Sequence, residues 1–259
     1  VGIACFVESS GGGPAESARI VINGPASIEL YTGCASSGQG HETVFAQILA
    51  DELSVPYTSI TVFHGTTTYV EQGYGTYHSR GVVMGGSAIT FAATKLVRQA
   101  VSLVASRAGL LPDVFEFRNG NIWRKGDEKP CVSLEALARE AAQGSSDALA
   151  ALQAEGTFEN TKLTYTYGAH AAHVAVDPET AMVDVLRYVL VEDVGRAINP
   201  LVVHGQAIGA AVQGMGGTFL DQFIYDETGQ MLTGTFADYL LPTSTDFPNV
   251  EAITLENFP

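Results

Sequence analysis

The chain has 259 residues, with 13 Lys and Arg against 28 Asp and Glu, so its formal net charge is −15. A chain of this length buries about three quarters of the surface that its unfolded form exposes, so it needs neither disulfides nor a metal to hold a core. The negative charge repels phosphate backbones and anionic lipid, which excludes nucleic acid and membrane surfaces as general partners. Charged residues make up 16% of the chain, below the usual value of about 25%, which predicts that part of the surface does not face water.

Cysteine usage points to a reducing compartment. Cys5, Cys34 and Cys131 are an odd, scattered set without a C-x-x-C pair, so a disulfide framework is not expected. The sequence shows neither a long uninterrupted apolar run nor a basic leader followed by an apolar one, so we expect no membrane span and a cytoplasmic location. Both ends, at Val1 and Pro259, are expected to lie inside a longer protein.

The first half of the chain predicts strands, a glycine loop and two helices. Apolar positions recur at helical spacing from His41 to Leu53, and Pro56 ends that helix. A long Ala-rich helix is expected from about Val83 to Ala108, ended by Gly109. The expected strands are Ile3–Val7, Ala18–Asn23, Ser27–Tyr31 and Ser59–Phe63.

The second half adds two hairpins and two helices. Asn119-Gly120 predicts a hairpin turn, and Ser133 predicts the N-cap of a short helix. The polar, Ala-rich stretch 143–156 is compatible with a linker or a short helix. A second hairpin is expected from Tyr165–Val176 and Met182–Glu192, and then a glycine-rich helix over Leu201–Phe223, whose glycines favour the close approach of a backbone or ligand.

The order of a strand, a polar loop, a Gly-Gln pair and a helix occurs twice, at Gly38-Gln39 and at Gly205-Gln206. Strands precede helices within each occurrence, which is the ordering of α+β proteins. The sequence therefore predicts two related lobes of strands with long helices, over residues 1–155 and 156–259.

The triplet Gly38-Gln39-Gly40 stands directly before the first predicted helix. Glycine lets a backbone approach a ligand, and the free N–H groups of a first helical turn favour an anion. The carboxamide of Gln39 donates and accepts at once, so it suits the edge of a pterin ring or a phosphate oxygen. We expect a ligand-binding loop here; the alternative is a flexible loop before an ordinary helix start.

A second candidate cluster is His78-Ser79-Arg80-Gly81. Ser79 is a candidate N-cap, Arg80 a fork of donors for phosphate or carboxylate, and Gly81 a point of backbone contact. The alternative is a capped helix with a surface arginine. No nucleophile motif or metal-ligand pattern stands out, because His170 and His173 are three apart on a predicted strand and point to opposite faces. We therefore expect no catalytic residue and no metal ligand in this chain.

Taken together and in order, six segments resemble the molybdenum-binding large subunit of the xanthine dehydrogenase, aldehyde oxidase and aerobic carbon monoxide dehydrogenase family. The resemblance covers nearly the whole chain and is carried by Gly2–Pro14, Tyr31–Thr43, Gly75–Gly81, Val176–Thr180, Glu192–Pro200 and Gly205–Gly214.

The resemblance implies a cofactor-binding portion of a molybdenum hydroxylase that acts on an aldehyde, a nitrogen heterocycle or carbon monoxide. It implies a molybdopterin cofactor, in bacteria often in its cytosine dinucleotide form, and an upstream molybdopterin domain. Electrons would leave through iron–sulfur and FAD subunits. The implied cofactor contacts are Gly38, Gln39, Gly40, His78, Ser79, Arg80, Gly81 and Gln206.

The family's catalytic glutamate lies in a Gly-x-Gly-Glu stretch, and this sequence has none. The resemblance therefore implies that the second lobe stops before the catalytic segment and that the chain alone does not turn over. A non-catalytic cofactor-binding or assembly module of the same fold is the alternative.

Overall fold

The structure is a computed structural model that describes residues 1–257, and it mixes helices with three sheets, which confirms the expected α+β class. Two compact units divide the chain. The contiguous unit runs from Ser9 to Thr164, and the split unit combines residues 1–8 with the chain from Tyr165 onward.

The contiguous unit is built on a four-stranded sheet in the order β4-β3-β2-β8. β2 pairs antiparallel with β3 and β8, whereas β3 and β4 pair in parallel because a helical crossover connects them. Side chains alternate along β2, and Ala18, Ile20 and Ile22 are buried on one face. The strands are β2 (Ala15–Gly24), β3 (Ser27–Thr32), β4 (Ile60–Phe63) and β8 (Gln153–Glu159).

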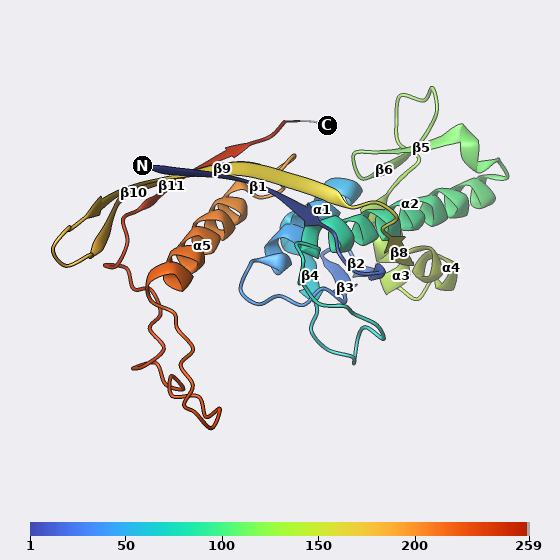
Figure 1. Ribbon diagram of the computed structural model, residues 1–259. Helices are drawn as coiled ribbons and strands as arrows, with labels where there is room; N and C mark the ends of the chain where they lie inside the picture. The colour runs from blue at the N-terminus through green and yellow to red at the C-terminus, as the bar shows by residue number, and fades with distance from the viewer. Residues whose placement is uncertain (258–259) are drawn as a thin grey trace. The chain divides into compact units, whose positions relative to one another are not determined.

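Two helices, α1 (His41–Leu53) and α2 (Ser87–Ala108), pack on this sheet and form the main core (Figure 1). α1 has the predicted bounds, and Gly109 ends α2 in the left-handed conformation with φ 67°. A π-helical stretch over Gly81–Gly86 leads directly into α2. A Cβ at Gly156 of β8 would lie 2.8 Å from the Cα of Ala92, so glycine is required where this strand crosses α2.

One stretch, Gly81–Ala108, is long and apolar enough by composition to cross a membrane, with a mean hydropathy of 1.2. Many of its apolar side chains, including Ile89 and Leu96, are fully buried in the core. The stretch is therefore the core helix of the contiguous unit.

The rest of the contiguous unit consists of a small sheet and two short helices. The predicted hairpin forms β5 (Phe115–Arg118) and β6 (Asn121–Arg124), and β6 also pairs with β7 (Val132–Ser133). The Ser133 Oγ accepts a hydrogen bond of 3.0 Å from the Ala136 N–H, which confirms the N-cap of α3 (Leu134–Ala142). The stretch left open at 143–156 contains α4 (Ser146–Ala151) and the start of β8.

The split unit is a four-stranded sheet in the order β1-β9-β10-β11, with α5 packed on it through Leu190, Ala207 and Ala211. β9 and β10 form the predicted antiparallel hairpin, and β11 lies parallel to β10. α5 ends at Phe219, four residues before the expected end. The elements are β1 (Gly2–Ser10), β9 (Thr164–Val176), β10 (Val183–Asp193), α5 (Pro200–Phe219) and β11 (Val250–Leu255).

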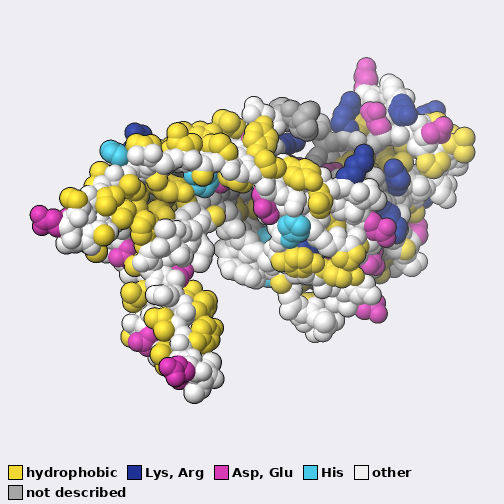
Figure 2. Space-filling view, in the orientation of Figure 1, with side chains coloured by type: hydrophobic (Ala, Val, Ile, Leu, Met, Phe, Trp, Pro, Cys, Tyr) yellow, Lys and Arg dark blue, Asp and Glu magenta, His cyan; other side chains and the backbone are white. Residues whose placement is uncertain are grey.

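The segment 220–249, between α5 and β11, is an irregular loop with one isolated bridge between Tyr225 and Met231. Figure 2 shows hydrophobic side chains along it. The exposed apolar side chains of this segment are Phe223, Ile224, Tyr225, Met231, Leu232, Phe236, Leu240 and Leu241.

The two units differ in their bounds from the expected lobes at 1–155 and 156–259, of which the last two residues lie outside the described chain. β8 belongs with the first part because it pairs with β2, and β1 belongs with the second because it lies beside β9. Strand pairing between distant segments therefore moves the boundary to Thr164 and assigns the first eight residues to the later unit.

Candidate functional site

The loop before α1 is an open glycine turn. Gly38 and Gly40 have φ values of +100° and +74°, which glycine adopts without strain. A Cβ at Gly38 would meet nothing within 4 Å, so this backbone faces free space. Gly40 is the N-cap of α1, and no side chain among the described residues caps that helix start. The loop therefore presents backbone donors at the positive end of a helix.

Gln39 joins this loop to the second candidate cluster. Its Nε2 donates a hydrogen bond of 2.9 Å to Thr76 Oγ1, and its Oε1 accepts from the backbone N–H of Ser37. Since an amide nitrogen carries two donors, one N–H of Gln39 is left for a ligand. The structure thus brings together the two loops, at 38–40 and at 76–81, that the sequence analysis singled out separately.

His41, the first residue of α1, lies beneath both loops with 5% of its surface exposed. Its ring nitrogens lie 3.4 Å from the Cys34 carbonyl oxygen and 3.4 Å from Thr76 Oγ1. Burial lowers the pKa of His41, so the neutral ring is favoured. A Cβ at Gly81 would lie 2.8 Å from His41 Cε1, so Gly81 is required where the second loop crosses this ring.

A second histidine fixes the outer side of the first loop. His64 accepts from the Ser36 N–H at 3.3 Å through Nδ1, so its Nε2 is the donor to Glu42 Oε1 at 2.7 Å. The backbone N–H of Glu42 and this contact with His64 lower the pKa of the Glu42 carboxyl. A carboxylate therefore sits in the first turn of α1, beside the free helix start.

His78 and Ser79 form the exposed tip of the second loop and both have positive φ values, 53° and 47°. His78 Nε2 lies 2.9 Å from Ser9 Oγ, and the loop is held by the Gly11 N–H, which donates to the His78 carbonyl at 3.2 Å. The expectation that Ser79 caps the following helix is wrong, because the helical stretch has Arg80 as its N-cap and no side-chain hydrogen bond there.

Arg80 is fully buried, and this corrects the expectation that it offers a fork of donors to an anion. Its Nη1 lies 2.6 Å from Glu16 Oε2, and its three nitrogens all donate to backbone carbonyls of the same unit. The side chain that sequence reasoning missed is Glu16, which carries no local motif and lies 64 residues away.

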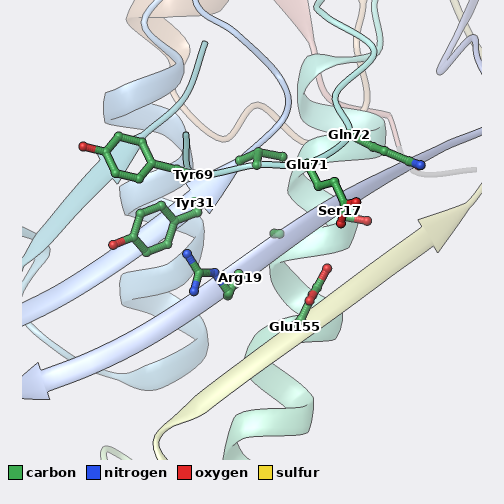
Figure 3. Close-up of a pocket in the computed structure, with 9 residues that line it drawn as sticks. Ser17, Arg19, Tyr31, Tyr69, Glu71, Gln72 and Glu155 are labelled. Atoms are coloured by element: carbon green, nitrogen blue, oxygen red, sulfur yellow. The ribbon is translucent and has the colours of Figure 1, made fainter. Parts of the chain in front are cut away.

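Two pockets flank the loops in the contiguous unit. A small one of about 230 Å³ is lined by glycines and threonines of the segments 32–35, 65–67 and 70–75. A larger one of about 410 Å³ lies over β2, β3 and β8 (Figure 3). In it, the guanidinium of Arg19 stacks 4.4 Å above the ring of Tyr31, and Glu71 and Glu155 also line it. Both pockets are open and lined by small or polar groups.

Gln206 lies on α5 in the split unit and its side chain is exposed. Among the glycines of α5, a Cβ at Gly216 would lie 2.7 Å from Pro242 Cγ, so the expected close approach of another segment occurs there. A Cβ at Gly205 or Gly209 would meet nothing within 4 Å, so these two glycines face open space in the described chain. The start of α5 is capped by Asn199, whose side chain accepts from the Val202 N–H at 3.2 Å. The candidate contact at Gln206 is therefore a free amide on a helix face of small residues.

The two loops suit a polar ligand that accepts hydrogen bonds. They offer backbone N–H groups, a half-satisfied carboxamide at Gln39 and glycine surfaces without side chains. Among residues 1–257 no group of three or more His, Cys, Asp or Glu side chains gathers as a metal site would require.

An α+β scaffold that presents donor-rich glycine loops has the features expected of a domain that binds a polar cofactor. The model of the family described as the molybdopterin cofactor-binding domain matches residues 1–248, and the chain belongs to that family. This finding confirms the resemblance drawn from the sequence.

Relatives and solved structures agree with this assignment. The chain is 35% identical over 99% of its length to the 6-hydroxypseudooxynicotine dehydrogenase complex subunit gamma of Paenarthrobacter nicotinovorans, covering 33% of that protein. It is 30% identical over 97% of its length to the carbon monoxide dehydrogenase large chain of Afipia carboxidovorans, covering 32%. Quinoline 2-oxidoreductase from Pseudomonas putida 86 matches with a TM-score of 0.85 and 33% identity, over 99% of this chain and 34% of the other. The chain thus spans about a third of each of these proteins.

Proposed function

We propose that this chain supplies part of the molybdopterin site of a molybdenum hydroxylase, with the loops at 38–40 and 76–81 holding the cofactor. The observation that carries the proposal is the hydrogen bond between Gln39 Nε2 and Thr76 Oγ1, which joins the two loops beside a free helix start. This hydrogen bond lets the two loops act as one binding surface.

Each loop has its own task in this site. Gly38 and Gly40 let the backbone reach the ligand, and the second N–H of Gln39 donates to an acceptor on the pterin or its phosphate. The exposed Ser79 hydroxyl contacts it from the other loop, and the buried Gly81 lets that loop pass close to the His41 ring. When bound, the group supplies the molybdenum-centred redox chemistry of the hydroxylase. Gln206 reaches the cofactor from α5 in the assembled subunit.

The remaining parts of the enzyme lie outside this chain. We infer a cytosine dinucleotide form of the cofactor, an upstream molybdopterin domain, iron–sulfur and FAD subunits as electron acceptors, and a catalytic glutamate from a later segment. The substrate classes are an aldehyde, a nitrogen heterocycle or carbon monoxide. The names of the relatives, which act on carbon monoxide, quinoline and a nicotine-derived compound, support a small-molecule substrate. We also infer a cytoplasmic location from the acidic charge and unpaired cysteines.

The test is the cofactor content of the complete subunit after the Gln39→Ala substitution. Loss of one hydrogen bond to a ligand and one between the loops predicts that the ratio of loaded to empty subunit falls about tenfold. Molybdenum and pterin are measured per subunit. Gln143→Ala is the matched control, because Gln143 is exposed at the end of α3. Unchanged occupancy in Gln39→Ala would refute the proposal.

A further inference from the structure

A buried ion pair lies directly behind the two loops. Glu16 on β2 and Arg80 at the start of the π-helical stretch have side chains with 0% exposure, and their charged atoms are 2.6 Å apart. Taking two charges out of water is costly, and their attraction repays this only when further hydrogen bonds satisfy both groups. The hydrogen bonds around Glu16 and Arg80 therefore determine whether the ion pair is favourable.

The guanidinium of Arg80 is bonded on every side. Its Nε donates to the Gly12 carbonyl at 2.8 Å, its Nη1 to the Gly75 carbonyl at 2.7 Å, and its Nη2 to the Ala15 carbonyl at 2.7 Å. The planar fork has fixed donor directions, so the segment 12–15 and the segment at Gly75 are held in a single relative position.

Glu16 extends the same network to the first loop. Its Oε2 accepts from the thiol of Cys34 at 3.2 Å, and its Oε1 accepts from the Ser17 N–H at 3.2 Å. Cys34 lies at the start of the loop that contains Gln39, and the ring of His41 is bonded to its carbonyl oxygen. The ion pair thus connects the roots of both cofactor loops.

The backbone segments around the ion pair are tightly packed against one another. A Cβ at Gly33 would lie 2.5 Å from the Cα of Gly73, and one at Gly12 would lie 2.7 Å from Cγ of the His78 ring. Backbone is pressed against backbone and ring here, so the carbonyls that Arg80 holds cannot shift without moving the loops.

Stability alone does not account for this pair, because well-packed apolar residues of similar volume serve as well or better. Apolar residues cannot donate a hydrogen bond to the Gly75 carbonyl, as Arg80 does. Gly75 directly precedes Thr76, whose hydroxyl accepts the hydrogen bond from Gln39. We propose that Glu16 and Arg80 are positioning residues that set the 75–81 loop against the 38–40 loop for cofactor binding. This inference rests on the proposed function. In it Arg80 holds the backbone behind the loops and does not contact the ligand.

The first test is Arg80→Lys in the complete subunit, which keeps the charge and loses the fork. The loaded-to-empty ratio is expected to fall about tenfold, while the exposed Arg98→Gln on α2 leaves it unchanged. In the Arg80→Lys background, adding Gln39→Ala is expected to lower the ratio further by less than about threefold, because Gln39 has already lost its position.

A purely structural role predicts the opposite, namely independent effects of Arg80→Lys and Gln39→Ala that multiply. If the two effects multiply, or if Arg80→Lys has a normal loaded-to-empty ratio, the inference is overturned. The proposed function still stands in that case, provided that Gln39→Ala by itself lowers the ratio. If Gln39→Ala alone has no effect, both are overturned.

A second variant covers the case in which Arg80→Lys does not fold. The double substitution Glu16→Gln with Arg80→Met removes both charges and keeps the volume, so the chain is expected to fold and its thermal midpoint serves as the readout. The folded double variant is expected to lose cofactor about tenfold, because the Gly75 carbonyl has no donor. Normal cofactor content in that variant would overturn the inference.

Discussion

Replacing Gly81 with alanine puts a methyl group against the ring of His41, and the cost follows from the geometry. The new Cβ would lie 2.8 Å from His41 Cε1, where ordinary contacts are 3.4–4 Å. The ring cannot turn away, because it is 5% exposed and its centroid is 4.7 Å from that of Phe45. Overpacking of this kind costs about 1–3 kcal/mol, which raises the locally open population roughly 5- to 150-fold.

Alkylation of Cys34 measures that opening. Burial, with Glu16 beside it, raises the pKa of the Cys34 thiol to about 12, and its surface is 0% exposed, so it reacts only when the site opens. Cys5 and Cys131 are exposed and are first replaced with serine. The rate of Cys34 labelling is then compared between the parent and Gly81→Ala chains. Gly24→Ala is the control, because a Cβ at Gly24 would meet nothing within 4 Å.

The origin of the effect is tested by removing the ring. In the His41→Ala background the added methyl has space, so Gly81→Ala is expected to change the labelling rate by less than about threefold. An unchanged rate in Gly81→Ala itself, or an equal rise with and without the ring, would refute the steric reasoning.

The remaining predictions concern acid stability, the core and the second unit. Burial lowers the pKa of His41 below the ordinary value of 6.5, so below pH 6.5 the unfolded chain binds more protons than the folded chain and the stability falls with the pH. The free energy of unfolding, measured in urea at pH 5 and at pH 8, should therefore differ less in His41→Gln than in the parent chain. Leu96→Ala removes a fully buried side chain and should cost about 2–5 kcal/mol in denaturant unfolding, against less than about 0.5 kcal/mol for Leu111→Ala, which is 70% exposed. Gln206→Ala in the complete subunit should lower cofactor content without shifting the melting temperature, because Gln206 is exposed; a normal content would remove it from the site.

Local signals in the sequence located most elements of the fold. α1 runs from His41 to Leu53 as expected, because its apolar spacing, the preceding glycine and the following Pro56 are all local features. Ser133 likewise identifies its helix start from its own side chain. Three strands were not predicted. The partners of β8 (Gln153–Glu159) and β11 (Val250–Leu255), which are β2 and β10, lie far away in the sequence, and β7 (Val132–Ser133) has only two residues.

In the candidate site, too, local patterns could be recognised in the sequence and contacts between distant residues could not. The glycines and Gln39 were identifiable because a glycine turn before a helix is a local pattern with a direct physical meaning. The role of Arg80 was not, because a sequence gives its donors but not its partner, and Glu16 lies 64 residues away on another strand. Where an arginine is followed by packed glycines, as at Gly81, Gly85 and Gly86, burial of its side chain is the alternative to weigh against exposure.

The most direct test of the central claim is a structure of the complete subunit with its cofactor bound. We expect Gln39 Nε2 and the backbone at Gly38 or Gly40 to lie within hydrogen-bond distance of the cofactor. We also expect the exposed residues His78 and Ser79 to contact it from the other loop, with the Arg80 guanidinium still on Glu16. A cofactor that touches neither loop, or that takes the Arg80 guanidinium as its own ligand, would contradict it.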